Sequence, residues 1–342
     1  MTFHITCNTD DNYAQHCCAM LCSLFENNRD MTFHVHLLTH GLSQESISLL
    51  NGLCHRYNNE LSIYDVDESK LEGVQFRKSR PLTKAAYYRI LLPEILSDCI
   101  ERVLYLDCDM IVVGDLKELF DLELEGYALA ATLDCMPWNS IHRKQLQFEA
   151  DERSFCSGIM VINLKYWREH DAVNRLLEYS KREKNPVYLH DQDSLNYVFK
   201  KQWYLLPPKW NKPALSFLPD VRNQLYFDTY EYVYEPKVIH YSSSMKPWFK
   251  MSFPYSELYV KYLRMSGFLN PVFQQVPSGK LIGFELLKLR YYVRKYILPF
   301  MPQLIMILIS DIVKYLRFLI SLTNKNRLRN YMLTEGIKAL RL

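Results

Sequence analysis

The fold is indicated most directly by the stretch RVLYLDCDMIVV at residues 102–113. Its first half, residues 102–106, is a nearly continuous apolar run, the pattern of a central parallel strand that is buried on both faces. Asp107 and Asp109 follow this run directly, and a second apolar run follows them. Because ligands of parallel α/β sheets bind at the carboxyl ends of the strands, we expect both carboxylates at the ligand-binding edge.

Two neighbouring carboxylates in a desolvated place repel each other unless a cation neutralises them. A divalent ion that bridges both carboxylates to a diphosphate would remove this cost and offset charge on a leaving group. The alternative is a strand-terminal aspartate that caps the next turn. The Asp-X-Asp pattern alone is weak, because it occurs at three places: Asp65/Asp67, Asp107/Asp109 and Asp191/Asp193. Only the middle pair lies between two apolar runs, and this context favours a metal site there.

His240 is the candidate third ligand, because it also ends a strand-like apolar run. A single histidine in such a place is more often a hydrogen-bonded core residue. As a ligand, its imidazole would shift the preference from Mg²⁺ toward Mn²⁺. The chain has ten glycines and neither a GxGxxG nor a P-loop motif, so a bound nucleotide must be held by side chains and a metal.

Strand-like and helix-like patterns alternate outward from this stretch, which predicts an α/β fold with a mostly parallel sheet flanked by helices. Strands are expected at residues 3–7, 33–38, 61–66, 102–106, 128–133, 158–163 and 238–241. Helices are expected at residues 13–24, 43–53 with Ser43 as its cap, 85–92 ending at Pro93, 166–181, and 194–199.

The composition is that of a protein with a large hydrophobic core. The chain has 342 residues, of which 49% are hydrophobic, enough for one large domain with a small appendage. Its nine cysteines include no CxxC pair and mostly lie in apolar runs, so we interpret them as buried hydrophobic residues in a reducing compartment. The first residues resemble a strand rather than a signal peptide, which favours a cytoplasmic protein.

Positive charge is concentrated near the end of the chain. From Lys280 onward there are twelve Lys and Arg against three Asp and Glu, whereas residues 1–279 carry a net charge of −6. We therefore expect a catalytic domain at 1–272 and a basic helical tail at 273–342, with an anionic partner for the tail.

The tail is expected to lie on a membrane surface rather than to cross the membrane. In residues 304–322 a polar stripe runs along one face of an otherwise apolar helix, which indicates an amphipathic helix. The stripe is formed by Ser310, Lys314, Arg317 and Ser321. Upstream, basic and aromatic residues alternate at 288–297, as suits an anionic bilayer. Packing on the body and dimerisation are the alternatives, and nucleic acid is not expected because no nucleic-acid-binding fold accompanies the charge.

From Phe3 to about Trp248 the sequence resembles glycosyltransferase family 8, which includes bacterial lipopolysaccharide galactosyl- and glucosyltransferases and the glycogenins. Short segments in the same order and spacing carry this resemblance: NTDDNYA at 8–14, AYYR at 86–89, VLYLDCD at 103–109, SGIMVINL at 157–164, Trp167, DQD at 191–193, His240-Tyr241 and KPW at 246–248.

The resemblance implies a GT-A fold, a UDP-sugar donor, Mn²⁺ or Mg²⁺, and transfer with retention of the anomeric configuration. Metal ligands would be Asp107, Asp109 and His240. Residues implied to hold the nucleotide and its diphosphate are Asn8, Asp10, Asn12, Tyr13, Asp107, Cys108, Asp109, Ser243 and Lys246. Tyr13 would stack on the base and Lys246 would meet the diphosphate. The alternatives are a capped helix start at residues 10–13 and a solvated loop lysine.

The residues implied to line the donor-sugar pocket are Arg89, Cys156, Ser157, Asp191 and Gln192, and those implied in catalysis are Gln192, Asp191, Asp134 and Arg89. Gln192 is a weak nucleophile, so its amide oxygen is expected to stabilise an oxocarbenium-like centre, while the leaving phosphate deprotonates the acceptor on the same face. Asp191 or Asp193 alternatively caps the following helix. Two positions depart from the family pattern: Cys156 replaces an asparagine, and Ser243 replaces a glycine.

These expectations together describe transfer of glucose or galactose from a UDP-sugar to a saccharide acceptor of lipopolysaccharide or another surface glycan, at the inner face of the cytoplasmic membrane. The acceptor is expected to be lipid-linked and to bind between residues 136–153 and 203–222, where Trp138, Trp210 and Phe217 either stack on sugars or pack internally. A protein-directed transferase that glycosylates an adhesin, and a non-catalytic nucleotide-sugar-binding scaffold, are the alternatives.

Overall fold

The computed structural model describes residues 2–76, 84–135, 140–149, 151–182, 187–214, 235–250, 254–268, 271–276, 279 and 281–296. The chain forms two compact units, Met1–Leu281 and Ile282–Leu342. Both sheets belong to the first unit, and the second contains nearly all of helix α12 (Leu281–Tyr296). The amphipathic helix expected at 304–322 lies outside the described residues. Among the described helices, none combines the length and apolar character that a membrane crossing requires.

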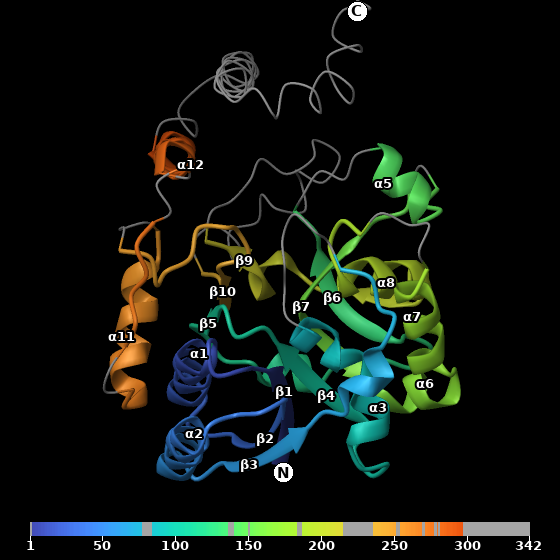
Figure 1. The fold of residues 1–342 in the computed structure, drawn as a ribbon, viewed down its shortest axis with the longest axis horizontal. Helices are drawn as coiled ribbons and strands as arrows, with labels where there is room; N and C mark the ends of the chain where they lie inside the picture. Colours follow the sequence, from blue (N-terminus) through green and yellow to red (C-terminus); the bar gives the residue numbers. More distant parts are fainter. Residues whose placement is uncertain are drawn as a thin grey trace, which may run out of the picture. The chain divides into compact units, whose positions relative to one another are not determined.

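A seven-stranded sheet forms the centre of the first unit (Figure 1). In order across the sheet its strands are β3 (Glu60–Asp65), β2 (Thr32–Thr39), β1 (Thr2–Asn8), β4 (Arg102–Leu106), β7 (Phe155–Asn163), β6 (Leu129–Leu133) and β8 (Trp203–Leu205). Strand β7 runs antiparallel to both of its neighbours, and the other pairs are parallel. The mostly parallel α/β sheet is confirmed, with β4 at its centre and fully buried from Val103 to Leu106.

A smaller sheet of three strands continues the chain beyond β4. It consists of β5 (Met110–Val112), β10 (Val238–His240) and β9 (Lys212–Pro213). Strand β10 pairs antiparallel with β5, so that His240 lies opposite Met110. The strand expected at 238–241 therefore exists but belongs to this second sheet, where it brings a residue distant in sequence next to the end of β4.

Helices cover both faces of the large sheet (Figure 1). Within the described residues of the first unit, the α-helices are α1 (Ala14–Glu26), α2 (Gln44–Arg56), α3 (Leu92–Ile95), α4 (Lys117–Phe120), α5 (Ser140–Gln145), α6 (Leu164–Glu169), α7 (Ala172–Ser180), α8 (Asp191–Val198) and α11 (Ser256–Ser266). The described part of the unit also contains the 3₁₀ helices η1 (Glu68–Leu71), η2 (Lys84–Leu91) and η3 (Pro208–Trp210).

Helix α1 is buried on all sides, although its sequence suggests a single apolar face. Every residue from Ala14 to Phe25 is buried, because α11 packs against α1 on the side away from the sheet. The buried His16 hydrogen-bonds at 2.7 Å to the hydroxyl of Tyr259 on α11. The sequence prediction missed α11, although its buried residues Tyr259, Tyr262, Leu263 and Ser266 have helical spacing.

Three predicted helices have different boundaries in the structure. The helix expected to stop at Pro93 does not stop there: η2 passes into α3, whose first turn accommodates the proline. The helix expected at 166–181 is two helices, because Asp171 takes a left-handed conformation with φ 49° that a right-handed helix cannot continue. Helix α8 begins at Asp191 instead of residue 194.

The capping role expected for Ser43 is confirmed, since its side chain accepts a hydrogen bond from the backbone N–H of Ser46. Asp11 accepts hydrogen bonds from the backbone N–H and the hydroxyl of Ser43 and from the hydroxyl of Ser46. The loop between β1 and α1 is thereby tied to the start of α2, which holds the carboxyl end of β1 in place.

Candidate active site

The structure brings Asp107, Asp109 and His240 together where β4 ends. One potential ligand atom from each residue lies within 4.8 Å of the others. Nε2 of His240 is 3.3 Å from Oδ1 of Asp109 and 3.9 Å from Oδ2 of Asp107. Two carboxylate oxygens and one imidazole nitrogen form a donor set that suits Mn²⁺, so the chemistry of these residues fits a divalent ion.

His240 is held in one orientation by a residue that the sequence analysis did not single out. Its Nδ1 hydrogen-bonds at 3.0 Å to the side-chain oxygen of Asn211, which leaves Nε2 facing the two aspartates. Burial lowers the pKa of His240, but the charge of Asp109 and the hydrogen bonds that the imidazole donates to Asp109 and Cys156 outweigh it and raise the pKa to about 10. Metal binding must therefore displace a proton from this imidazole.

Asn211 is expected to strengthen metal binding through this contact, because a partner on the outer nitrogen orients a ligating histidine. We predict that Asn211→Ala weakens Mn²⁺ binding by about 10–100-fold, measured by calorimetry, whereas Asn211→Asp keeps an acceptor and largely retains the affinity. Asn51→Ala on the exposed face of α2 is the matched control. Equal Mn²⁺ affinity in wild type and Asn211→Ala would contradict this role.

Gly158 on β7 provides the space in which the cluster forms. A Cβ atom at this position would overlap Cε1 of His240 and would lie 2.9 Å from Cε of Met110 and 3.0 Å from Oδ2 of Asp107. The backbone oxygen of Gly158 accepts a hydrogen bond of 2.8 Å from the N–H of Asp107. The glycine thus lets β7 approach the end of β4 closely enough to support both Asp107 and His240.

The buried Arg89 links Asp107 to Ser157 and Asp191. Its side chain is 5% exposed, and it donates to Oδ1 of Asp107 at 2.9 Å and to the backbone oxygen of Ser157 at 2.7 Å. Its Nε lies 3.2 Å from Oδ2 of Asp191. The hydroxyl of Tyr105 also donates to Oδ1 of Asp107 at 2.7 Å. Arg89 therefore holds several site residues in position at once.

A chain of hydrogen bonds fixes Gln192 beside this group. Its amide nitrogen donates to Oδ2 of Asp134 at 2.8 Å, and its amide oxygen accepts from the backbone N–H of Ser157 at 2.9 Å and from the Ser157 hydroxyl at 3.2 Å. Because Asp134 as a carboxylate only accepts, it determines which end of the amide faces Ser157.

Asp191 lies in the first turn of α8, after His190, whose φ of 56° is unusual for a residue with a side chain. The Asp191 side chain pairs with Arg89 instead of capping the helix. Burial raises the pKa of Asp191 to about 7 against the opposing charge of Arg89.

The other two Asp-X-Asp pairs have structural partners. Asp193 accepts from the backbone N–H groups of Tyr188 and Leu189 and contacts His142 at 2.8 Å. Asp67 caps η1, and Asp65 pairs with His40 at the surface. Of the three pairs, Asp107/Asp109 lies at the end of a buried strand, where Asp109 contacts His240 and Lys246.

The residues expected to hold the nucleotide lie on two sides of the aspartates. Lys246 is 2.5 Å from Oδ2 of Asp109 and also donates to the backbone oxygen of Tyr241 at 2.7 Å. Burial alone would raise the pKa of Asp109, but Lys246 and His240 outweigh it and hold this pKa far below its usual range. Lys246 is thus within reach of an anion at the aspartates.

The loop between β1 and α1 forms the other side of the expected nucleotide site. The ring of Tyr13 is 37% exposed and meets Trp248 edge-on at 5.7 Å. Burial, followed by the charge of Asp109, raises the pKa of Tyr13. Asp10 accepts from the backbone N–H of Tyr13 at 3.0 Å, and Asn12 is exposed.

Three further predicted residues have side chains that serve the fold. The amide of Asn8 donates to the backbone oxygen of Ala85 at 3.0 Å. Cys108 points away from its flanking aspartates, and its thiol donates to the backbone oxygen of Asn8 at 3.1 Å. The hydroxyl of Ser243 forms a local turn with the backbone of Met245. Any contact from Cys108 to a nucleotide would have to come from its backbone.

Cys156 and Ser243 depart from the family pattern, and Trp210 belongs to a segment expected to bind the acceptor. Cys156 interacts with His240. Ser243 keeps a negative φ, so no glycine conformation is required there. Trp210 is 1% exposed and packs internally, so it cannot stack on a sugar. Trp138 and Phe217 lie outside the described residues.

The mixed sheet and the acidic cluster at its carboxyl edge together define a GT-A-like glycosyltransferase. Residues 4–252 match the family model of glycosyl transferase family 8, and the chain belongs to this family.

Two curated relatives and one solved structure illustrate the match. General stress protein A of Bacillus subtilis (strain 168) is 30% identical over 271 residues, which cover 76% of this chain and 92% of the relative. A lipopolysaccharide 1,2-glucosyltransferase of Escherichia coli is 29% identical over 252 residues, covering 72% and 73%. The galactosyltransferase LgtC, crystallised with donor and acceptor sugar analogs, aligns with a TM-score of 0.69 at 25% identity over 81% of this chain and 99% of LgtC.

Proposed function

We propose that this glycosyltransferase moves a hexose, glucose or galactose, from a UDP-sugar to a saccharide acceptor in the synthesis of lipopolysaccharide or another surface glycan. The observation that carries the proposal is the cluster of Asp107, Asp109 and His240 at the carboxyl end of a buried strand. The galactosyltransferase and lipopolysaccharide glucosyltransferase activities named for two relatives support a hexose donor and a saccharide acceptor.

In this proposal the cluster holds Mn²⁺ or Mg²⁺, which would neutralise the donor diphosphate and the charge that develops on departing UDP. The ammonium group of Lys246 leaves Asp109 and pairs with a phosphate oxygen. Tyr13 stacks on the uracil, and Asp10 and Asn12 lie beside it. Gln192 stabilises positive charge at the anomeric carbon, and Asp134 and Ser157 hold its amide in place. Asp191 and Arg89 support the sugar pocket. LgtC, which is 25% identical to this chain, also has a glutamine in its active site, since a solved active-site variant replaces it with glutamate.

The direct test is calorimetric binding of UDP with and without Mn²⁺, to the wild type and to Asp109→Ala. We expect binding that requires Mn²⁺ and is lost in the variant, because Asp109 supplies one of two carboxylate oxygens. Hydrolysis of UDP-glucose and UDP-galactose by the wild type then identifies the donor. If UDP does not bind under either condition, the chain is not a UDP-sugar enzyme.

Attachment of the basic tail to the inner face of the membrane belongs to the same proposal, because it would bring the enzyme to a lipid-linked acceptor. Helix α12 exposes the apolar side chains of Ile282 and Leu289, as a surface-binding helix does.

A further inference from the structure

Three histidines gather on the large sheet away from the aspartate cluster. His4 lies on β1, and His34 and His36 lie on the adjacent strand β2. The parallel register places His4 opposite His34 and Thr6 opposite His36, so that all three side chains share one face of the sheet. One ring nitrogen from each lies within 4.8 Å of the others.

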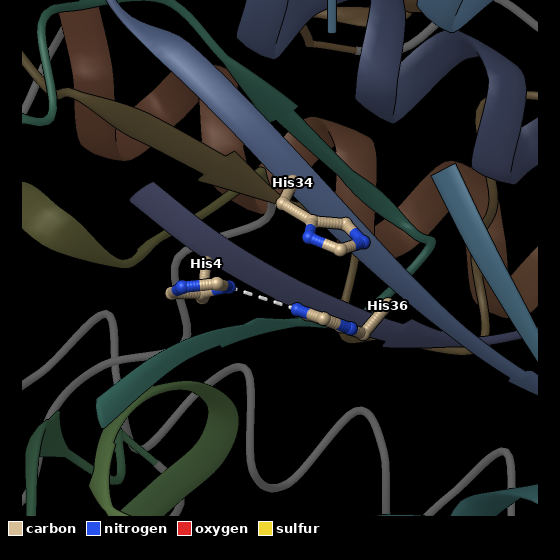
Figure 2. Close-up of side chains that lie close together, drawn as sticks. All are labelled: His4, His34 and His36. Carbon is tan, nitrogen blue, oxygen red and sulfur yellow. Dashed lines mark hydrogen bonds between the residues drawn. The ribbon is translucent and has the colours of Figure 1, made fainter. Parts of the chain in front are cut away.

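The rings present nitrogens to one another (Figure 2). Nδ1 of His4 is 2.9 Å from Nε2 of His36. The ring of His34 stacks on that of His36 with centroids 4.2 Å apart, and the His4 and His36 centroids are 5.2 Å apart. Three imidazoles at this spacing can converge on one ion by small side-chain rotations, since a zinc–nitrogen bond is about 2.0–2.1 Å.

Two of the three imidazoles, those of His4 and His36, have a lowered pKa. Burial and the neighbouring histidines lower the pKa of His36 to about 3. Burial, followed by His34, also lowers the pKa of His4.

Strand β3 supplies supporting partners on the same face. Nδ1 of His36 lies 3.0 Å from the hydroxyl of Tyr64, and Nε2 of His34 lies 2.8 Å from Oγ of Ser62. The exposed carboxylate of Glu60 approaches Nδ1 of His34 at 3.4 Å. Ser62 and Tyr64 are partners of the kind that orient metal-binding histidines. They leave Nδ1 of His34, beside Glu60, and Nε2 of His36 as the nitrogens that would bind an ion. His4 and His34 are partly exposed, so an ion can reach the cluster from solvent.

We propose that His4, His34 and His36 form a second metal site, for a divalent transition ion of the zinc type. A set of three imidazoles suits Zn²⁺, Cu²⁺ or Ni²⁺ and disfavours Mg²⁺, so this site and the two-carboxylate cluster select different ions. An ion there joins β1 to β2. The competing possibility is a cluster of neutral histidines held together by hydrogen bonds alone.

The test uses the full chain and Zn²⁺ alone as the probe, in an Asp109→Ala background that removes the carboxylate cluster as a zinc site. We expect calorimetry to detect one bound Zn²⁺. His34→Gln or His4→Gln, both at partly exposed positions, is then added to this background. Each should weaken Zn²⁺ binding by more than the loss of a supporting partner does, which is about 10–100-fold. His55→Gln, at an exposed position on α2, is the matched control and should bind like the background.

Two further readouts separate this site from the buried cysteines Cys7, Cys17 and Cys108, whose thiols also lie close together. Zn²⁺ should raise the melting temperature of the background variant but not that of the His34→Gln or His4→Gln variants, because an ion stabilises only the fold that binds it. Co²⁺ should give visible bands without thiolate charge-transfer absorption. Equal Zn²⁺ affinity with and without His34 and His4, or thiolate bands with Co²⁺, would overturn the proposal.

Discussion

Replacing Gly158 with alanine is expected to abolish Mn²⁺-dependent UDP binding and sugar transfer. The added methyl group would overlap the ring of His240 and crowd Oδ2 of Asp107, so one of the two must move out of the cluster. Mn²⁺ affinity should fall beyond the about 10–100-fold expected for losing a supporting residue. The free energy of unfolding should fall by about 1–3 kcal/mol, as for other overpacked sites.

The matched control is Gly52→Ala on α2, where an added Cβ meets no atom within 4 Å. This change should leave metal binding unaltered and raise the free energy of unfolding by about 0.5–1 kcal/mol, because alanine is the better helix former. Calorimetry with Mn²⁺ and UDP, together with thermal unfolding, measures both effects. A folded Gly158→Ala protein that binds Mn²⁺ like the wild type would contradict a metal site that needs both His240 and Asp107 in place.

Gln192→Ala is expected to lower kcat by about 10²–10³-fold, the usual cost of removing one group that stabilises developing charge. Binding of UDP and Mn²⁺ should remain close to wild type, because Gln192 contacts Asp134 and Ser157 rather than the metal cluster. Steady-state kinetics with the UDP-sugar and calorimetry with UDP measure the two quantities separately.

Asp134→Asn provides the companion variant for Gln192. It keeps the size of the side chain but removes the charge that determines which end of the Gln192 amide faces Ser157. A smaller loss of kcat than in Gln192→Ala, with unchanged UDP binding, would fit a positioning role for Asp134. If kcat is unchanged in Gln192→Ala, this glutamine takes no part in transfer.

Much of the central architecture could be predicted from the sequence. The run at 102–106 is β4 as expected, because an unbroken apolar segment of this length is stable only where both faces of a strand are covered. Asp107 and Asp109 stand directly after it, so their place at the sheet edge follows from chain connectivity. Ser43 likewise caps α2 through a contact between near neighbours.

Features that depend on distant contacts were predicted less well. The all-round burial of α1 results from α11, more than 200 residues later in the chain, so the pattern of α1 alone could not reveal it. The break at Asp171 has no glycine or proline to mark it, because aspartate tolerates the left-handed conformation. The antiparallel direction of β7 also left no clear signal, since a strand buried on both faces looks alike in either direction.

The sequence by itself determined the α/β class, the buried strand and the acidic pair that ends it, because local pattern and connectivity dictate these features. Only the tertiary structure decided the surroundings of that pair: the antiparallel pairing that brings His240 to it, the contact from Asn211, and the space left by Gly158. The grouping of His4, His34 and His36 likewise depends on the register between β1 and β2. Such groupings join residues far apart in the chain, and their spacing is set by packing rather than by sequence separation.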